Sequence, residues 1–438
     1  MNRRVKQVAA VMLAGAMAAT MIPVQAGAEE GEKVKIKIAW WGGQSRHEYT
    51  QKLLELYQES HPNVEFEGVP SGWDGYFDKL STQAASGSMP DIVQMDYMYI
   101  STYANNQSVA DLAEYVEDGT IDVTDIDEKL MASGNIGGRL AGIPLSSSII
   151  TVGYNPQVIA DAGVEKPTND WTWADYVDMS EQISNKTGKP SAMISSGAVG
   201  DTIVFHYWVR QHGASLFNEE GTGLGYEDDQ VCADYFQMWK DMIDKNAFTD
   251  PDEYAQIQTL GQEAGPVVTG DAATVFDWNN YSARVSVAND TIKLVTPPLA
   301  DNSDNKGLWI KPGMYFSVAE TSEVKKECAE FINWFVNSEE ANDIIMAERG
   351  TPVSSAIREY MINSGKMSPQ QVDMFEYVDL AAEFCGDTPA PEPSGIAEVN
   401  EAFSNAGNSV FYGQATAEEA AASFREEANL ILERNNRK

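Results

Sequence analysis

The chain has 438 residues and a formal net charge of −36, because 66 Asp and Glu residues stand against 30 Lys and Arg residues. The sequence has no basic run that could follow a phosphate backbone, and this balance excludes nucleic acid as a partner. The three cysteines, Cys232, Cys328 and Cys385, are too few and too far apart for a disulfide framework or a zinc site. We therefore expect three buried free thiols and no metal.

The first 28 residues have the pattern of a secretory signal peptide. Arg3, Arg4 and Lys6 precede an apolar stretch from Val8 to Val24, and small residues follow at 26–28. We expect cleavage near this point and an exported protein, periplasmic or extracellular at the cell surface. No later stretch is apolar over a spanning length, and no cysteine near the cleavage region is available to carry a lipid anchor.

The first predicted elements after the signal are a strand, a helix and a second strand. In residues 33–38 lysines alternate with valine and isoleucine, which is the period of a strand. The predicted helix carries Leu53, Leu54 and Tyr57 on one side and ends before Pro62. The strand-like stretch "NVEFEGV" follows it.

Further along the chain, strands and helices continue to alternate. "PDIVQMD" is a short strand of the buried type, and "GIPLSSSIITVGYN" is a long extended stretch. A capping pair, Thr172 with Asp175, opens a helix, residues 324–335 have helical spacing, and Thr416 with Glu419 opens the last helix. This alternation predicts an α/β fold with sheets covered on both faces.

Three aromatic stretches lie where a ligand crevice is expected, at the carboxyl ends of strands. The first is "WWGGQSRH", in which Gly42 and Gly43 allow close backbone approach; its spacing is not that of a phosphate loop. The second is "SGWDGY", where a glycine-bounded Trp73 is poorly placed to pack a core. The third is the pair Asp96 and Tyr97 in "QMDYMYI".

Flat aromatic faces beside carboxylates and an arginine are the side chains that bind carbohydrate. The apolar face of a sugar packs on indole or phenol rings, and its hydroxyl groups bond to Asp and Arg. Most aromatic residues nevertheless belong to a core, and helical spacing predicts this for Trp171, Trp173, Trp239, Phe331 and Trp334. Trp278 and Trp309 are intermediate, because each ends a strand-like run.

Two other classes of function remain open. An exported glycan hydrolase or lyase would share the aromatic cleft, but it needs an acid and a base that no motif singles out, and the four histidines match no zinc or nucleophile pattern. A binder of a polyamine or a peptide would tolerate the acidity. A polyamine site needs several carboxylates around each ammonium group, whereas the loops of this chain have more aromatic rings than acidic residues.

The order and spacing of several segments over nearly the whole chain after the signal resemble the family 1 extracellular solute-binding proteins of ABC transporters, the maltose-binding-protein-like group. Within this group, "WWGG" with "RH" and "SGWDGY" resemble the subset encoded beside plant-polysaccharide utilisation genes. The segments are "WWGGQSRHEYT", "SGWDGYFDKLSTQAASGSMPDIVQMDY", "LAGIPLSSSIITVGYNPQVIADAGV", "VVTGDAATVFDWNNY", "FINWFVNSEEAND" and "GQATAEEAAASFREEANLILE".

The resemblance implies a two-lobe periplasmic-binding-protein fold, type II-like, in which each lobe is a sheet covered by helices and three crossovers form the hinge. Lobe one would be 33–146 with 314–368, and lobe two 151–309 with 370–438. The crossovers would lie near Ile143 to Ser148, near Leu308 to Tyr315 and around Met367.

It also implies a monomer without catalytic residues, cofactor or metal, which closes on an oligosaccharide, plant-cell-wall sugars included, and delivers it to the permease subunits of an ABC importer. Arg46 and His47 would bond to hydroxyl groups or to a uronate carboxylate. The expected ligand-binding residues are Trp40, Trp41, Arg46, His47, Trp73, Asp74, Tyr76, Asp96 and Tyr97 in lobe one, and Ser146, Ser147, Ser148, Trp278, Asn279 and Trp309 in lobe two and at the hinge.

Overall fold

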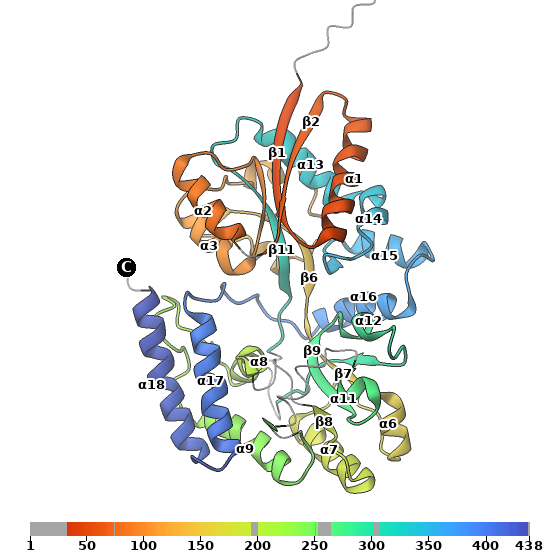
Figure 1. Cartoon of the computed structure of the whole chain (residues 1–438), viewed down its shortest axis with the longest axis vertical. Helices are drawn as coiled ribbons and strands as arrows, with labels where there is room; N and C mark the ends of the chain where they lie inside the picture. The colour runs from red at the N-terminus through yellow and green to blue at the C-terminus, as the bar shows by residue number, and fades with distance from the viewer. Residues whose placement is uncertain are drawn as a thin grey trace, which may run out of the picture.

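The structure, a computed structural model, describes residues 33–73, 75–193, 200–249, 251–252, 264–300 and 307–436. The predicted signal peptide lies outside these residues. Figure 1 shows the described chain as two lobes, one above the other, and each lobe has its own sheet with helices packed around it. The prediction of a two-lobe α/β fold is confirmed.

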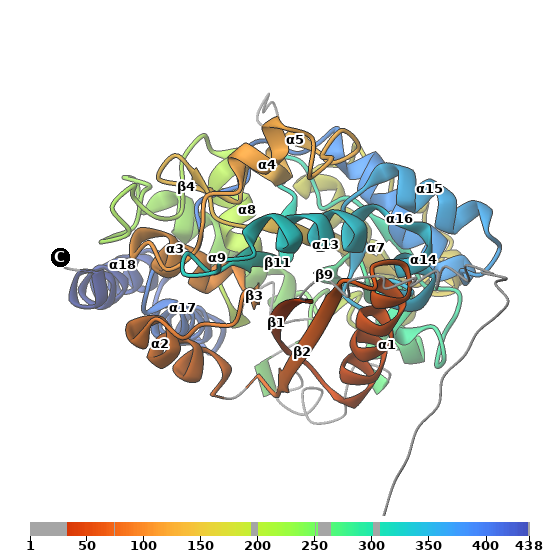
Figure 2. The same cartoon turned by 90° about the horizontal axis from the view of Figure 1, so that it is seen from above.

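The first lobe contains a six-stranded sheet in the order β12-β6-β11-β3-β1-β2. Its strands are β1 (Val34–Trp41), β2 (Val64–Ser71), β3 (Ile92–Met95), β6 (Ile143–Ser148), β11 (Lys311–Val318) and β12 (Thr351–Pro352). Its helices are α1 (Gln44–Ser60), α2 (Tyr76–Ser86), α3 (Tyr97–Asn105), α4 (Ala113–Glu117), α5 (Glu128–Ala132), α13 (Lys325–Asn337), α14 (Glu339–Ile345) and α15 (Ser355–Asn363). Figure 2 shows α1 and α14 on one side of β1 and β2, and α2 and α3 on the other.

A short hairpin is attached to the first lobe. Its strands are β4 (Asn135–Ile136) and β5 (Arg139–Leu140). Gly137 and Gly138 join them with φ values of 60° and 82°. Both residues of such a tight turn need positive φ, which glycine adopts without strain.

The second lobe contains a four-stranded sheet in the order β10-β7-β9-β8. Its strands are β7 (Ile150–Tyr154), β8 (Ala192–Met193), β9 (Thr274–Trp278) and β10 (Lys293–Val295). Its helices are α6 (Pro156–Asp161), α7 (Trp173–Thr187), α8 (Ile203–Gln211), α9 (Gln230–Asp244), α11 (Pro266–Thr269), α12 (Tyr281–Val285), α16 (Pro369–Ala382), α17 (Ile396–Phe411) and α18 (Ala417–Asn436). Within the described part of the chain, no helix has the length and apolar content needed to cross a bilayer.

Both predicted helix caps are confirmed. The Thr172 hydroxyl accepts a hydrogen bond from the Asp175 backbone N–H at 3.2 Å, and the Asp175 carboxylate accepts one from the Thr172 N–H at 2.8 Å. Thr416 and Glu419 make the same reciprocal pair at the start of α18. Such a pair satisfies two N–H groups that a helix end otherwise leaves without partners.

The predicted core residues and thiols are also found inside. Trp171, Trp173, Trp239 and Phe331 are buried, and Trp334 packs half-buried against the core. All three cysteines are buried and free. The predicted helix at 324–335 is α13, on which Cys328 and Phe331 face inward.

The long extended stretch at 142–155 forms two strands rather than one. β6 belongs to the first sheet and β7 to the second, and only Ile149 separates them. The Ile149 backbone N–H donates to the Asn279 side chain at 3.1 Å, and the Asn279 amide donates to the Thr351 hydroxyl of β12 at 3.0 Å. The chain therefore passes between the lobes at a buried, hydrogen-bonded point.

A segment of the second lobe, residues 383–395 between α16 and α17, lies between the two lobes. In Figure 1 the chain from α16 to α17 crosses the space between the two sheets. The Lys129 ammonium of α5 donates to the Cys385 carbonyl at 2.7 Å, and the Thr388 hydroxyl donates to the Ile310 carbonyl at 2.9 Å. These bonds hold the crossing segment against the first lobe.

Candidate functional site

The carboxyl ends of three strands of the first lobe meet at one edge of its sheet. β1 pairs in parallel with β2 from Val34↔Val64 to Trp41↔Ser71, and with β3 at Ile38↔Ile92. Since parallel strands end on the same side, the loops at Gly42, Trp73 and Asp96 lie along one edge. In Figure 1 this edge of the first lobe faces the second lobe.

The prediction that Trp40 and Trp41 lie in a loop is wrong. Both residues end strand β1, and both rings are buried, Trp40 with 1 % of its surface exposed. Successive strand residues point to opposite faces, so the Trp40 ring lies toward α1, close above Gly68, and the Trp41 ring toward α2. The glycines that follow end the strand and do not expose the tryptophans.

Arg46 and His47 lie in the first turn of α1 and already have partners. The Arg46 guanidinium donates to both carboxylate oxygens of Glu348, at 3.0 and 3.2 Å, and the Tyr49 hydroxyl donates to the same carboxylate at 2.5 Å. Burial raises the pKa of Glu348, but the bonds from Arg46 and Tyr49 outweigh it and hold that pKa below its ordinary value. The Trp40 indole N–H donates to His47 Nδ1 at 3.2 Å.

Trp73 lies in the loop between β2 and α2, as expected, and 44 % of its surface is exposed. Its ring packs edge-on against Trp41 at 5.2 Å and Phe77 at 5.4 Å, and it lies 6.3 Å from the Tyr99 ring. Phe77 and Tyr99 stack on each other at 3.9 Å. Together Trp41, Trp73, Phe77 and Tyr99 form an outer aromatic cluster at the edge of the first lobe.

Two further predicted residues in this region differ in their setting. Tyr76 is buried at the start of α2, and its hydroxyl donates to the Gln94 carbonyl at 2.8 Å, so it holds α2 to the sheet. Asp74 lies outside the described residues.

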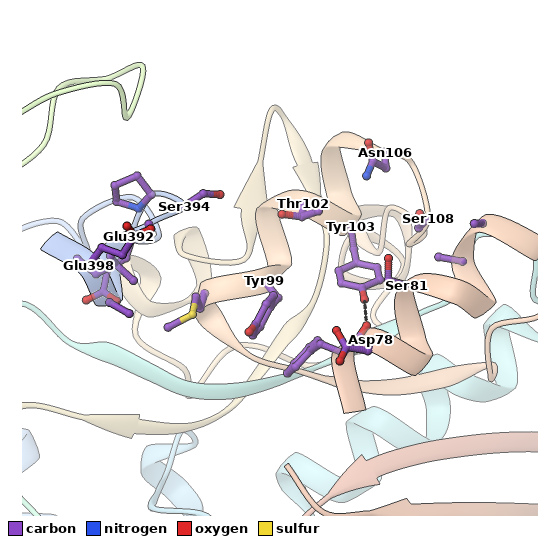
Figure 3. Close-up of a pocket in the computed structure, with 18 residues that line it drawn as sticks. Asp78, Ser81, Tyr99, Thr102, Tyr103, Asn106, Ser108, Glu392, Ser394 and Glu398 are labelled. Atoms are coloured by element: carbon purple, nitrogen blue, oxygen red, sulfur yellow. Dashed lines mark hydrogen bonds between the residues drawn. The ribbon is translucent and has the colours of Figure 1, made fainter. Parts of the chain in front are cut away.

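A cavity of about 770 Å³ lies next to the outer aromatic cluster; Phe77 and Tyr99 of this cluster line it, whereas Trp41 and Trp73 do not. Figure 3 shows its two sides: residues of α2 and α3 on one, and the segment around the start of α17 on the other. Tyr99 and Phe77 supply rings, Asp78, Glu392 and Glu398 supply carboxylates, and the exposed Met98 adds an apolar side chain. The remaining polar lining residues are Ser81, Thr102, Tyr103, Asn106, Ser108 and Ser394.

Asp96 and Tyr97 lie beside this cavity, at the start of α3. The Asp96 carboxylate caps the helix by accepting from the Met98 N–H at 2.8 Å. Burial raises the pKa of Asp96, although the charge of Lys311 acts against it. The Tyr97 hydroxyl donates to the Pro389 carbonyl of the crossing segment, so this tyrosine joins the first lobe to that segment.

Lys311, at the start of β11, carries a positive charge that acts on several carboxylates. Its ammonium lies 5.2 Å from the centre of the half-buried Trp278 ring. Burial raises the pKa of Glu392, which Lys311 lowers and Asp96 raises further. Burial also raises the pKa of Asp201 to about 7, with Glu392 adding to the shift and Lys311 opposing it.

Glu392 therefore belongs both to the wall of the cavity and to the charged group around Lys311. Asp277, next to Trp278, is paired with Arg284 at 2.6 Å. Burial raises the pKa of Asp277 even so. Glu392 thus connects the cavity to this charged group, and we treat the two together as the candidate site.

The prediction that Ser146, Ser147 and Ser148 belong to the second lobe is wrong, because all three lie in strand β6 of the first-lobe sheet. The remaining predicted residues, Asn279 and Trp309, lie at the hinge with them. Ser146, Ser147 and Asn279 are buried, and Ser148 pairs with Lys311 in the ladder between β6 and β11. Trp309 is buried against the His206 ring at 4.9 Å, with the Arg210 guanidinium 5.4 Å from its centre. These side chains support the crossovers between the lobes.

Sequence reasoning missed Tyr99, Phe77, Glu392, Lys311 and Asp201. Tyr99 stood within the quoted "QMDYMYI", and its position two residues after Tyr97 was the available signal. Glu392 stands in "TPAPEPSG", whose prolines favour an extended connection. For Lys311 and Asp201 there was no local signal, because only the fold brings them together.

His206, which packs against Trp309, is not suited to acid–base catalysis. Burial, together with the charge of Arg210, lowers the pKa of His206 to about 3, so its imidazole is neutral. Among the residues that the structure describes, no three His, Cys, Asp or Glu side chains are arranged to hold a metal ion.

Residues 43–342 match the family model described as bacterial extracellular solute-binding protein. A putative ABC transporter periplasmic-binding protein of Escherichia coli K12, YcjN, is 25 % identical over 206 residues, 44 % of this chain and 46 % of that protein. The chain spans about half the length of the curated relatives it matches.

Two solved structures show the same fold over nearly the whole chain. A family 1 extracellular solute-binding protein from Alicyclobacillus acidocaldarius is 27 % identical with a TM-score of 0.80, covering 92 % of this chain and 99 % of that one. A periplasmic oligogalacturonide-binding protein from Yersinia enterocolitica, in complex with saturated digalacturonic acid, is 25 % identical with a TM-score of 0.72, covering 92 % and 100 %. The chain thus belongs to the bacterial extracellular solute-binding proteins of family 1.

Proposed function

We propose that this protein binds oligosaccharides outside the cytoplasm and delivers them to an ABC importer. The observation that carries the proposal is the cavity between the lobes, where the rings of Tyr99 and Phe77 lie among hydroxyl and carboxylate side chains and beside the exposed Trp73. Rings take the apolar face of a sugar, and the polar side chains take its hydroxyl groups. The oligogalacturonide ligand of the Yersinia protein supports carbohydrate as the ligand class.

The proposed mechanism is closure of the two lobes on the sugar. We propose lobes at the predicted boundaries, 33–146 with 314–368 and 151–309 with 370–438, with the crossovers as the only stretches of chain that run from one lobe to the other. Trp73 and Tyr99 would hold the sugar on the first lobe, and Trp278 and Glu392 would contact it from the other side. A ligand that touches both sides favours the closed form, since only its additional contacts there shift the population.

A thermal-shift screen tests the ligand class. Pectic, xylan-derived, mannan-derived and starch-derived oligosaccharides are added to the purified protein, and its melting temperature is measured. A sugar at 100 times its Kd adds about 2.7 kcal/mol to the free energy of unfolding. If no oligosaccharide raises the melting temperature while a polyamine or peptide does, the carbohydrate proposal fails.

Small-angle scattering then tests closure. The radius of gyration of the loaded protein should be smaller than that of the empty protein, because the empty form opens at a small polar interface. The same data report the molecular mass, for which we propose a monomer. Identical curves at demonstrated saturation would contradict closure.

We further propose that the protein is not an enzyme, that residues 1–28 are a signal peptide, and that the permease subunits of an importer are its partners. Incubation with each bound sugar, followed by a search for new reducing ends or unsaturated products, separates binding from hydrolase or lyase activity. Turnover that continues in proportion to the protein concentration would favour the enzyme alternative.

A further inference from the structure

The charged side chains of the described cavity wall are all carboxylates. Asp78 lies on α2, Glu392 on the crossing segment and Glu398 in the first turn of α17, and no Lys, Arg or His side chain lines the cavity with them. Glu398 is paired with Arg434. Asp78 and Glu392 have no such ion pair among the described residues.

Two of the cations near the site, Arg46 and Arg284, are paired with carboxylates. Arg46, which the sequence suggested for a uronate, makes a bidentate pair with Glu348. Arg284 is paired with Asp277 at 2.6 Å. Lys311 makes no ion pair among the described residues, but its ammonium lies 5.2 Å from the centre of the Trp278 ring and its charge acts on three carboxylates, those of Asp96, Asp201 and Glu392.

The carboxylates of the cavity wall can accept hydrogen bonds from hydroxyl groups. An ionised carboxylate accepts hydrogen bonds and donates none, so a neutral sugar offers it suitable donors. A uronate instead brings another acceptor charge, and like charges placed against each other in a partly desolvated site weaken binding strongly. The net charge of −36 on the whole chain adds long-range repulsion of a polyanion.

We infer that the cavity between the lobes selects uncharged oligosaccharides and discriminates against sugars that carry carboxylates. This inference rests on the proposed function and specifies its ligand. It separates this protein from the Yersinia relative, whose bound ligand is an acidic sugar.

The test uses sugars that differ only in the carboxylate. Trigalacturonate is compared with the galactotriose made by reducing its carboxyl groups, and a glucuronate-branched xylo-oligosaccharide with its carboxyl-reduced form. Calorimetry should show the uncharged member of a pair binding at least about 100-fold more tightly. High salt should reduce the difference in affinity between the two members of a pair, because it screens the repulsion of the acidic sugar.

A double variant, Asp78→Asn with Glu392→Gln, locates the cause. Affinity for the acidic sugar should rise by about tenfold or more relative to the neutral sugar. The control, Glu59→Gln with Glu165→Gln, removes the same two charges at exposed positions outside the cavity and should leave the ratio unchanged. If the double variant does not fold, Glu392→Gln alone and the salt series give the same comparison.

The outcomes separate this inference from the proposed function. The charge selectivity is overturned if the acidic sugar binds as tightly as the neutral sugar or more tightly. It is also overturned if the double variant leaves the affinity ratio of the two sugars unchanged. In both cases carbohydrate binding stands. If neither member of any pair binds and the wider oligosaccharide panel also gives no shift, the proposed function falls and this inference with it.

Discussion

Two aromatic clusters of similar composition differ in how much of their rings is exposed. The inner aromatic cluster of the second lobe consists of Trp173, Tyr176, Trp239 and Phe276, all buried, with Trp173 stacked on Phe276 at 5.7 Å. The outer aromatic cluster at the edge of the first lobe also has four rings, but Trp73 keeps 44 % of its surface exposed. Similar side chains thus serve packing in one lobe and present a surface in the other.

The difference comes from the backbone that carries the rings. Trp173 sits in the first turn of α7, whose inward face is fixed by the helical period, and its indole N–H donates to Gln211 at 2.9 Å. Trp73 follows a strand end and stands between glycines, so no regular element covers it. Exposure of an aromatic ring beside a cavity therefore indicates binding, whereas ring number alone does not.

The largest effect is expected from emptying the inner cluster. Trp173→Ala removes a buried ring and its hydrogen bond, which should lower the free energy of unfolding by roughly 3–5 kcal/mol. Urea denaturation measures this loss. Trp73→Ala serves as the control and should lose far less, because its ring is exposed. A stable Trp173→Ala protein that no longer binds sugar would reverse the roles of the two clusters.

The second effect concerns the outer cluster. Trp73→Ala should weaken sugar binding by about tenfold or more, since ring stacking contributes about 0.5–1.5 kcal/mol beyond the buried area. Calorimetry on the sugar found by the screen measures it. The matched control is Leu430→Ala, which removes an exposed apolar side chain of α18 outside the cavity. Unchanged affinity in Trp73→Ala would remove that tryptophan from the site.

Much of the fold was accessible from the sequence because its signals are local. The period of residues 33–38, the caps at Thr172 and Thr416, and the inward face of α13 all formed as expected. The division of residues 142–155 between two sheets was not visible, because both halves read as strand and only pairing with distant strands separates them at Ile149.

The site was harder to predict, because it depends on contacts between distant segments. Trp73 has the exposed setting that its glycines indicated, whereas Trp40 and Trp41 extend β1 instead of forming a loop. Arg46 read as a free cation, but Glu348, about 300 residues away in sequence, occupies it. Local spacing does not contain such pairings.

A smaller effect on stability is expected from the buried carboxyl group of Asp201. Asp201 precedes α8, whose Trp208 lies 5.3 Å from Trp173, and burial raises the pKa of Asp201 to about 7. The folded state thus holds the Asp201 proton more tightly than the unfolded state, whose carboxyl titrates near 3.9. This group therefore adds stability as pH falls from about 8 to about 4, and its ionised form costs stability at higher pH.

Asp201→Asn should consequently raise the free energy of unfolding more at pH 8 than at pH 5. The expected difference is about 1 kcal/mol after allowance for partial exposure. Urea denaturation at both pH values measures the difference. Asp228→Asn is the control, because this exposed aspartate makes the same kind of bond to the backbone N–H two residues later. A gain from Asp201→Asn that is equal at both pH values would contradict the shift.

The smallest effect on binding is expected at Trp40, the tryptophan whose position the sequence suggested wrongly. Its ring lies so close to Gly68 that a Cβ there would come within 2.9 Å of it, and its N–H bonds to His47. Trp40→Phe should lose that hydrogen bond, at about 0.5–1.5 kcal/mol of stability. Affinity for the sugar should change by less than about twofold, because the buried ring offers no face to a ligand. Melting curves and calorimetry on the same preparation measure both quantities, and Trp73→Phe provides the exposed counterpart. If Trp40→Phe weakened binding as much as Trp73→Ala, the ring would have to turn outward in the loaded protein, and the distinction between covered and exposed rings would not predict function here.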